Sequence, residues 1–416
     1  MAEALGNLQG SLGYHLEVLK PVTDRQEALA VGEALAKNSP DLLVIGLVTF
    51  ATGEVLDPLL LLPLPKVLWA LPEAWEGGAL PQNALCGLNL ALSLPACRPP
   101  VKWAYGPPDP RGVQHALEPT LGALRGLIPL RKARLLWIGG AAPGFEAFGE
   151  KPTTGVQVDE ASLKDLFTLW REVGEREVQQ LLEAWQDPGE VGQEERVRLG
   201  RLALALERLG QGYDGLALRD WPEIPDTLGL FPSAALAVLA DRGRVVAPEG
   251  DLMGLLSQLV LRAVGGGHPL LLDLVTSREE GILLWHSGEA PVAWAEGPVR
   301  LLLHFNRGLP AVRDMVLRPG PVTGIRISRK RIALVRGMLE KGPRYWGCSG
   351  WLTRPSWGRS TLEPRALLSR WLEAQMPHHL ALILGDHGEA LRELAAWTGM
   401  ELLGEEVKPV WGVSWP

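Results

Sequence analysis

The chain has 416 residues, enough for two or three domains rather than one. Hydrophobic residues make up 46% and charged residues 21%, which is typical of a globular protein and excludes a disordered one. The formal net charge of −7, with no basic run longer than residues 329–331, excludes the electrostatic surface of a nucleic-acid-binding protein.

Residues 1–130 alternate between helical and strand-like patterns. Asp24 is a plausible N-cap for a helix whose apolar residues recur at helical spacing. The continuous apolar run after Asp41 is typical of a buried parallel strand. The predicted helices cover residues 24–37 and 113–127, and the predicted strands cover 41–50, 66–71 and 101–105. This alternation predicts a doubly wound, Rossmann-like α/β domain.

A second doubly wound α/β domain is expected over residues 131–267, and it carries Glu249. Its predicted strands are 133–138, 214–218 and 245–247, and its predicted helices lie within 162–185, 194–209 and 233–239. The three glycines at 265–267 mark the end of this domain, where the pattern changes.

Residues 268–416 indicate a mostly β C-terminal domain. Strand-like runs at 270–275, 281–285, 299–304 and 322–327 are separated by short Gly/Pro turns rather than by helices. A helix over 364–374, a strand over 380–384 and a helix over 389–397 are expected to close the domain. The fold class is therefore α/β, with two Rossmann-like domains followed by this third domain.

Cysteine usage, the N-terminal residues and the lack of a long apolar run predict a cytoplasmic protein. Three scattered cysteines are too few for a disulfide framework or a thiolate zinc site. The first residues lack the basic start and apolar core of a signal peptide, and no run of about 18 apolar residues predicts a membrane span. Abundant proline and an excess of arginine over lysine point to a thermophilic source.

Histidines and carboxylates gather in the second half of the chain. Six of the eight histidines lie between His268 and His387. Asp273 lies inside an apolar strand, where an ionised carboxylate needs a partner or a metal, unless the strand register turns it toward solvent. Carboxylates and imidazoles from different strands suit a hard-to-borderline divalent ion such as Mn²⁺.

Other motifs do not support a different chemistry. Residues 139–144 follow a predicted strand but lack the GxGxxG spacing, and Pro143 would interrupt a phosphate-binding turn. Ser287 next to His286 is discounted as a nucleophile pair, because adjacent strand residues face opposite sides.

Five short segments, in this order and spacing, carry a resemblance to a known family. They are residues 247–254, 269–273, 284–291, 320–323 and 377–386. Together they resemble the L-fucose isomerase and L-arabinose isomerase superfamily. The first half of the chain resembles that superfamily only in the alternation of its predicted strands and helices.

The resemblance implies a divalent metal, Mn²⁺ in the family, held at the junction of the second and C-terminal domains. By position, it assigns Glu249, Asp273, His379 and His286 as the metal ligands. Glu249 and Asp273 also correspond to the acid/base pair that moves a proton between C2 and C1 of the sugar. Asp251 is expected either to support a ligand from behind or to be the N-cap of the following helix.

The function implied is a metal-dependent aldose–ketose isomerase that acts on a free sugar through an ene-diol. A non-catalytic sugar-binding or regulatory relative that retains the fold and metal site is the alternative. An epimerase or lyase that uses the same intermediate is a third reading. The expected partners are a small sugar and further copies of the chain, as a trimer or hexamer, without nucleic acid or membrane.

Overall fold

A computed structural model describes residues 1–416 apart from 74–76, 153–154 and 186. The chain divides into two compact units. Unit 1 consists of Met1–Leu124, Glu389–Gly399 and Glu406–Pro416, and unit 2 consists of Arg125–Gly388 and Met400–Glu405. The finer division at residues 130 and 267 stays a prediction.

Unit 1 is built on a parallel sheet with the strand order β1-β2-β3-β18. The strands are β1 (Leu43–Leu47), β2 (Lys66–Ala70), β3 (Val101–Tyr105) and β18 (Val410–Ser414). Strand β18 comes from the last residues of the chain and pairs in parallel with β3. The sequence patterns predict the first three strands but not β18, whose exposed and half-buried residues lack an apolar run.

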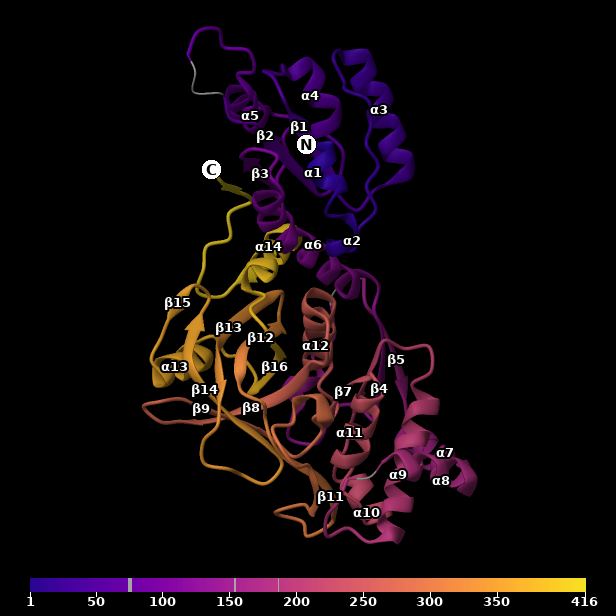
Figure 1. The fold of residues 1–416 in the computed structure, drawn as a ribbon. Helices are drawn as coiled ribbons and strands as arrows, with labels where there is room; N and C mark the ends of the chain where they lie inside the picture. Colours follow the sequence, from indigo (N-terminus) through magenta and orange to yellow (C-terminus); the bar gives the residue numbers. More distant parts are fainter. Residues whose placement is uncertain (74–76, 153–154, 186) are drawn as a thin grey trace. The chain divides into compact units, whose positions relative to one another are not determined.

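Helices cover both faces of this sheet (Figure 1). On one face lie α3 (Arg25–Asn38), α4 (Gly53–Leu60) and α5 (Ala84–Ser93), and on the other lie α1 (Ala2–Gly6), α2 (Gln9–Leu12) and the first part of α6 (Pro110–Lys132). The predicted cap is confirmed, because the Asp24 carboxylate accepts the Glu27 backbone N–H at the start of α3. Helix α14 (Gly388–Thr398) also belongs largely to this unit.

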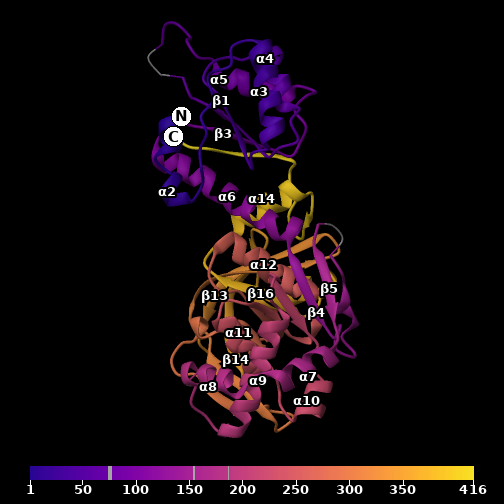
Figure 2. The same cartoon turned by 90° about the vertical axis from the view of Figure 1, so that its right-hand side faces the viewer.

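Unit 2 contains a second parallel sheet with the order β5-β4-β6-β7. Its strands are β4 (Arg134–Ile138), β5 (Gln157–Ala161), β6 (Gly215–Leu218) and β7 (Val245–Ala247). Helices gather beside it in Figure 2: α7 (Leu163–Glu172), α8 (Glu175–Ala184), α9 (Gln193–Leu209), α10 (Glu223–Leu228) and α11 (Ser233–Asp241). The predicted stretch 162–185 is two helices, because the chain leaves helical geometry at Val173 and Gly174 caps the second helix.

The mostly β part of unit 2 contains a closed barrel. Its antiparallel strands follow in the order β14 (Cys348–Trp357), β9 (Ile282–His286), β8 (Leu270–Ser277), β16 (His379–Leu384), β12 (Gly320–Ser328) and β13 (Arg331–Glu340), and β13 pairs back to β14. Strands β10 (Arg300–Leu303), β11 (Pro310–Val316), β15 (Ser360–Thr361) and β17 (Glu401–Leu402) extend it, and α13 (Pro364–Glu373) packs against it. The predicted mostly β region is confirmed.

Helix α12 (Leu252–Gly265) joins the parallel sheet and the barrel of unit 2 (Figure 1). It is buried along almost its whole length, because it contacts β6 and β7 as well as β12 and β16. Its N-terminus therefore lies where the end of the sheet meets the barrel.

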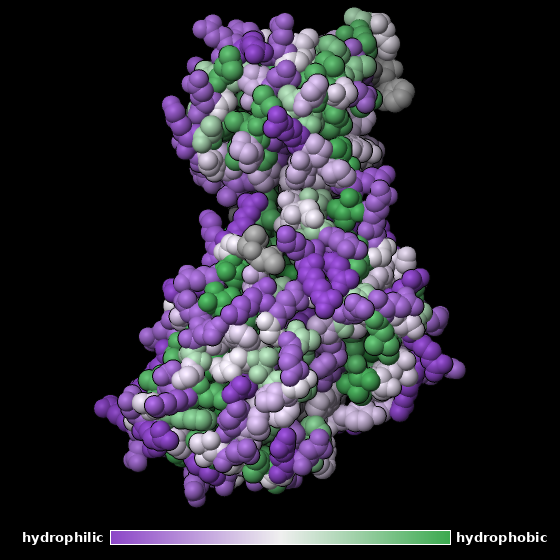
Figure 3. All heavy atoms as spheres, turned by 180° about the vertical axis from the view of Figure 1, so that it is seen from behind, coloured by the Kyte–Doolittle hydropathy of each residue, from purple (hydrophilic) through white to green (hydrophobic). Residues whose placement is uncertain are grey.

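The surface is mixed. On the face shown in Figure 3, hydrophobic side chains occur in small groups between hydrophilic ones. Among the residues that the structure describes, no helix has the length and apolar character needed to cross a membrane.

Candidate active site

The side chains of the candidate site come from the ends of strands in two different sheets of unit 2. Asp220 follows β6, and Glu249 follows β7, so both lie at the carboxyl edge of the parallel sheet. That edge is where α/β proteins commonly bind ligands. From the barrel, Asp273 in β8 and His379 at the start of β16 are directly paired across the ladder, and His286 ends β9.

The structure brings all four predicted site residues together. His379 Nε2 lies 3.3 Å from Glu249 Oε2 and 3.2 Å from Asp273 Oδ1. Potential ligand atoms of Asp273, His286 and His379 all lie within 4.8 Å of one another. The solvent-facing register left open for Asp273 is wrong, because only 21% of its side chain is exposed and it points at His379.

Three atoms at the centre of this cluster have no hydrogen-bond partner. They are Glu249 Oε2, Asp273 Oδ1 and His379 Nε2, and all three are buried. Buried polar atoms in native proteins are normally satisfied, so three unsatisfied atoms converging on one point indicate a missing ligand. Two carboxylate oxygens and imidazole nitrogens are donors suited to a divalent cation such as Mn²⁺, so the residues present fit a metal.

The backbone around Glu249 is held in an unusual conformation. Glu249 has φ +59°, in the left-handed region, and Gly250 follows with φ +70°. A Cβ at Gly250 would lie 2.1 Å from the carbonyl oxygen of Gly140, so only glycine fits there. Two hydrogen bonds fix the Glu249 backbone. Its N–H donates to Asp220 Oδ1, and its C=O accepts from the Ala142 N–H. Strain of this kind is frequent at functional sites.

His379 is oriented from behind by Asp251. The Nδ1 atom of His379 lies 2.8 Å from Asp251 Oδ2, and Asp251 also forms a fully buried pair with Arg326. Asp251 is in addition the N-cap of α12, since it accepts the Gly254 N–H. Both roles proposed for Asp251 are thus present, and the Nε2 atom of His379 is directed to the carboxylates of Glu249 and Asp273.

Electrostatics at His379 favour a positive charge. Burial alone would lower the pKa of His379, but its hydrogen bond to Asp251 and the nearby carboxylates of Asp273 and Glu249 raise that pKa well above its usual value. Burial likewise opposes ionisation of Asp273, yet the surrounding imidazoles lower its pKa. An environment that stabilises a proton on His379 also stabilises a divalent cation in its place.

His286 has its own carboxylate partner. Its Nδ1 lies 2.6 Å from Glu289 Oε2, and the Ser233 and Ser287 hydroxyls donate to Glu289 Oε1. Although burial opposes it, Glu289 raises the pKa of His286 to about 9. The view that His286 and Ser287 face opposite sides is wrong, because β9 ends at His286 and both residues turn toward Glu289. A carboxylate behind each imidazole is typical of metal-binding histidines.

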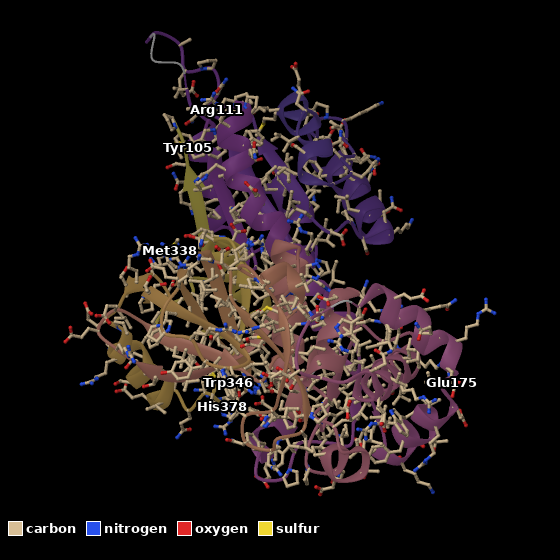
Figure 4. The ribbon with its side chains drawn as sticks, turned by 60° about the horizontal axis from the view of Figure 1, so that its bottom comes forward. Tyr105, Arg111, Glu175, Met338, Trp346 and His378 are labelled. Atoms are coloured by element: carbon tan, nitrogen blue, oxygen red, sulfur yellow. The ribbon has the colours of Figure 1, made fainter. Side chains whose placement is uncertain are left out.

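The predicted ligand set did not include two further residues of the cluster, although the sequence does place His378 beside His379 at the start of an apolar strand. His378 is 45% exposed, and its Nε2 lies 3.6 Å from Asp273 Oδ1 and 4.0 Å from Glu249 Oε2. His378 is labelled in Figure 4. Asp220 is buried, and burial together with Glu249 and Glu289 raises its pKa to about 8. Its place directly after a parallel strand, like that of Glu249, is the signal that could have identified it.

No protein-family model matches the chain. Sulfoquinovose isomerase from Priestia aryabhattai is 27% identical over 423 residues, which cover 95% of this chain and 92% of that protein. Sulfoquinovose isomerases from Alkalicoccus urumqiensis and Clostridium sp. (strain MSTE9) are 25% and 26% identical, and cover 86% and 87% of this chain. The match to the Priestia aryabhattai enzyme spans almost the whole chain.

These relatives define the class of the protein: it is a sugar isomerase. More specifically, it is an aldose–ketose isomerase, an intramolecular oxidoreductase.

Proposed function

We propose that this enzyme interconverts a free aldose and its ketose through an ene-diol, with a divalent metal held by Glu249, Asp273, His379 and His286. The observation that carries the proposal is the convergence of three unpartnered buried atoms, one each from Glu249, Asp273 and His379. The resemblance to the L-fucose and L-arabinose isomerase superfamily supports the same ligand set. Mn²⁺ is the first metal to test, because mixed oxygen and imidazole donors suit it.

The substrate class follows from the relatives. They are sulfoquinovose isomerases, so we propose sulfoquinovose, a hexose with a sulfonate on C6, as the first substrate to test. Assembly as a homo-oligomer and a cytoplasmic location stay predictions.

The chain's own residues supply the proton transfers. One carboxylate of the Glu249–Asp273 pair takes the proton from C2 of the open-chain aldose while O1 gains a proton, which gives the ene-diol. A proton then returns to C1 and O2 loses its proton, which leaves the ketose. A bound divalent metal would polarise O1 and O2 and stabilise negative charge that develops on them.

The surroundings prepare these groups for that role. Each carboxylate has a second oxygen besides the one directed at His379, so one residue can both bind a cation and exchange a proton. Asp251 and Glu289 fix the imidazoles of His379 and His286, which keeps their Nε2 atoms available. Phe148 stacks on His379 at a centroid distance of 4.3 Å and excludes water from that side.

Hydrogen exchange at C2 tests the proposal directly. The protein is stripped of metal, and sugars including sulfoquinovose, glucose and several pentoses are incubated with it in D₂O, with added Mn²⁺ or with chelator. We expect deuterium at the transferred position and ketose formation for at least one sugar, abolished by chelator. Ketose formation that persists in chelator would contradict the metal dependence, and ketose formed without any solvent exchange would argue for hydride transfer rather than an ene-diol.

A further inference from the structure

One exposed arginine packs on Trp221, the residue that follows Asp220 of the candidate site. Arg307 is in the turn between β10 and β11, and its guanidinium carbon lies 5.7 Å from the ring centroid of Trp221. Within the part of the chain that the structure describes, no carboxylate lies within 4 Å of its guanidinium. Its charge is therefore available to a ligand.

A series of aromatic contacts leads from Arg307 to the candidate metal ligands. Trp221 meets Phe145 edge-on at 5.6 Å between ring centroids, and Phe145 meets His378 at 5.8 Å. His378 in turn lies 3.6 Å from Asp273. Trp221 also directly follows Asp220, which accepts the Glu249 N–H. Arg307 is thus connected to the candidate metal ligands through the side chains of Trp221, Phe145 and His378.

The turn that carries Arg307 is held in place by a buried histidine. His304 Nδ1 accepts the backbone N–H groups of Asn306 and Arg307, both at 3.3 Å. The His304 ring packs on Phe231 at a centroid distance of 3.7 Å. Because burial lowers the pKa of His304 to about 4, its ring stays neutral and Nδ1 remains an acceptor near neutral pH. The base of the turn is therefore ordered, and the arginine side chain extends from a fixed point.

The charges of the site explain why such a cation is needed. An anionic sugar would approach Glu249, Asp273 and other carboxylates, which repel it. Nearby arginines are already engaged: Arg326 pairs with Asp251, Arg219 with Glu223, and Arg313 with Asp187 and Asp241. Arg307 differs from them because its guanidinium has only the Trp221 ring beneath it.

We infer that Arg307, supported by Trp221, binds a tetrahedral oxyanion at the end of the sugar remote from the reacting carbons. This inference rests on the proposed function and defines its substrate class as aldoses with an anionic group on the terminal carbon. A sulfonate and a phosphate monoester share this chemistry, and the planar guanidinium binds either through paired, charge-assisted hydrogen bonds. The sulfonate is the form that the named relatives act on.

Binding to the metal-free protein and turnover by the Mn²⁺-loaded enzyme test the assignment separately. The probes are sulfoquinovose, glucose 6-phosphate and neutral 6-deoxyglucose, with titration calorimetry for binding and ketose formation for turnover. In Arg307→Gln, we expect binding of sulfoquinovose to weaken at least tenfold, with a similar loss in kcat/KM. For 6-deoxyglucose, binding and turnover should change less than twofold. Binding of glucose 6-phosphate shows whether the subsite also accepts a phosphate monoester.

Arg278→Gln is the matched control. Arg278 also stacks on a tryptophan of unit 2, with its guanidinium carbon 5.1 Å from the Trp351 ring, but it lies at the opposite end of β9 from His286. It should leave binding and turnover of all three sugars unchanged. Circular dichroism and thermal unfolding of both variants exclude a loss of folding.

The subsite and the isomerase proposal fail in different ways. Equal binding of sulfoquinovose by Arg307→Gln and by the wild-type protein overturns the subsite, even if both isomerise it. Selective binding of the sulfonated sugar that depends on Arg307, without ketose formation, supports the subsite and overturns the proposed substrate. Equal affinity of the wild-type protein for sulfoquinovose and 6-deoxyglucose also overturns the subsite.

Discussion

Each unit contains a buried cluster of charged side chains. The charged atoms of the unit 1 cluster have hydrogen-bond partners, whereas three buried atoms of the unit 2 cluster have none. In unit 1, Lys102 donates hydrogen bonds to Ala116 O, Thr120 Oγ1 and Glu393 Oε1, and Thr120 donates to the other oxygen of Glu393. In unit 2, the Glu249, Asp273 and His379 cluster leaves three buried atoms without partners. Burial of charge alone therefore does not distinguish a structural cluster from a candidate binding site. The distinguishing feature is that three unsatisfied atoms lie next to one another.

The energetics of the two clusters differ for the same reason. The unit 1 cluster links β3 and α6 to α14, whose residues are far apart in sequence, and its cation has three acceptors. Such a pair is stabilising only while both charges are present. The unit 2 cluster carries an unrelieved desolvation cost that the proposed cation would offset. Variants of each cluster should therefore change different properties.

The largest effect is expected for Glu249→Gln, which keeps the shape of the side chain and removes its basicity. Isomerisation should fall by roughly 10²–10⁴-fold, as expected when a general acid/base is lost. The measurement is initial ketose formation with Mn²⁺ at saturation, so that weaker metal binding does not account for the loss. Stability should not fall, because the change removes a charge from a cluster crowded with carboxylates.

Glu160→Gln is the control for this change. Glu160 is exposed and pairs with Lys151, so the same chemical change there should leave activity as it is in the wild-type protein. Activity of Glu249→Gln within a few-fold of the wild-type enzyme would remove Glu249 from proton transfer and leave it as a ligand only.

In the unit 1 cluster, Lys102→Met should lower stability rather than activity on a per-molecule basis. It leaves the Glu393 carboxylate buried without its cation, and breaking a buried pair in this way costs about 3–5 kcal/mol of unfolding free energy. Urea denaturation measures the loss. Burial already raises the pKa of Glu393, so its charge is retained chiefly through Lys102.

The double variant Lys102→Met/Glu393→Met identifies the cause. With both charges removed, most of the loss should be recovered, because no unpaired charge remains. A double variant as unstable as the single one would mean that packing, not charge, is what Lys102 contributes.

The parts of the fold that sequence reasoning predicted are those with strong local patterns. Apolar runs predicted β1, β3 and β7, and Asp24 marked the start of α3. Strands β13 and β14 were not predicted, because their residues are mostly buried on both faces and contain glycines, Pro355 and a register shift, so the alternating pattern is lost. The return of β18 to the first sheet depends on long-range pairing, which no local pattern records.

The candidate site was predictable to a similar extent. The resemblance selected Glu249, Asp273, His286 and His379, and the structure brings them together. The carboxylates that hydrogen-bond the imidazoles are harder to predict from sequence. Glu289 contacts His286 because the chain turns after the strand, and Asp251 contacts His379 although 128 residues separate them in the chain. These contacts depend on how the sheet and the barrel meet.

His304 is a buried titratable residue with no carboxylate hydrogen-bonded to its ring. Its protonation should make the free energy of unfolding depend on pH. Burial lowers the pKa of His304 from 6.5 to about 4, with Arg307 acting in the same direction and Glu289 against it. Between these values the unfolded chain binds more protons than the folded one, so stability falls as the pH is lowered through this range. At pH 4.5, about 2 kcal/mol of unfolding free energy should be lost through this group relative to pH 7.

His304→Asn separates this group from the others that titrate. Asparagine retains a side-chain acceptor for the turn but does not titrate, so urea denaturation at the two pH values should show a smaller decrease in the variant. Equal decreases in both proteins would contradict the assignment, whatever the stability of the variant at pH 7.

The smallest effect is expected at Glu289, which would influence the proposed metal only through its hydrogen bond to His286. Glu289→Gln keeps the size of the side chain but weakens the hydrogen bond that fixes His286 Nδ1, so Mn²⁺ affinity should fall by roughly tenfold. Competition against a fluorescent chelator measures this affinity. Ser287→Ala is the matched control, because it removes one hydrogen bond to Glu289 Oε1 and leaves the carboxylate on His286. An affinity unchanged in Glu289→Gln would mean that His286 does not bind the metal, and would confine the ligands to the three residues whose atoms lack partners.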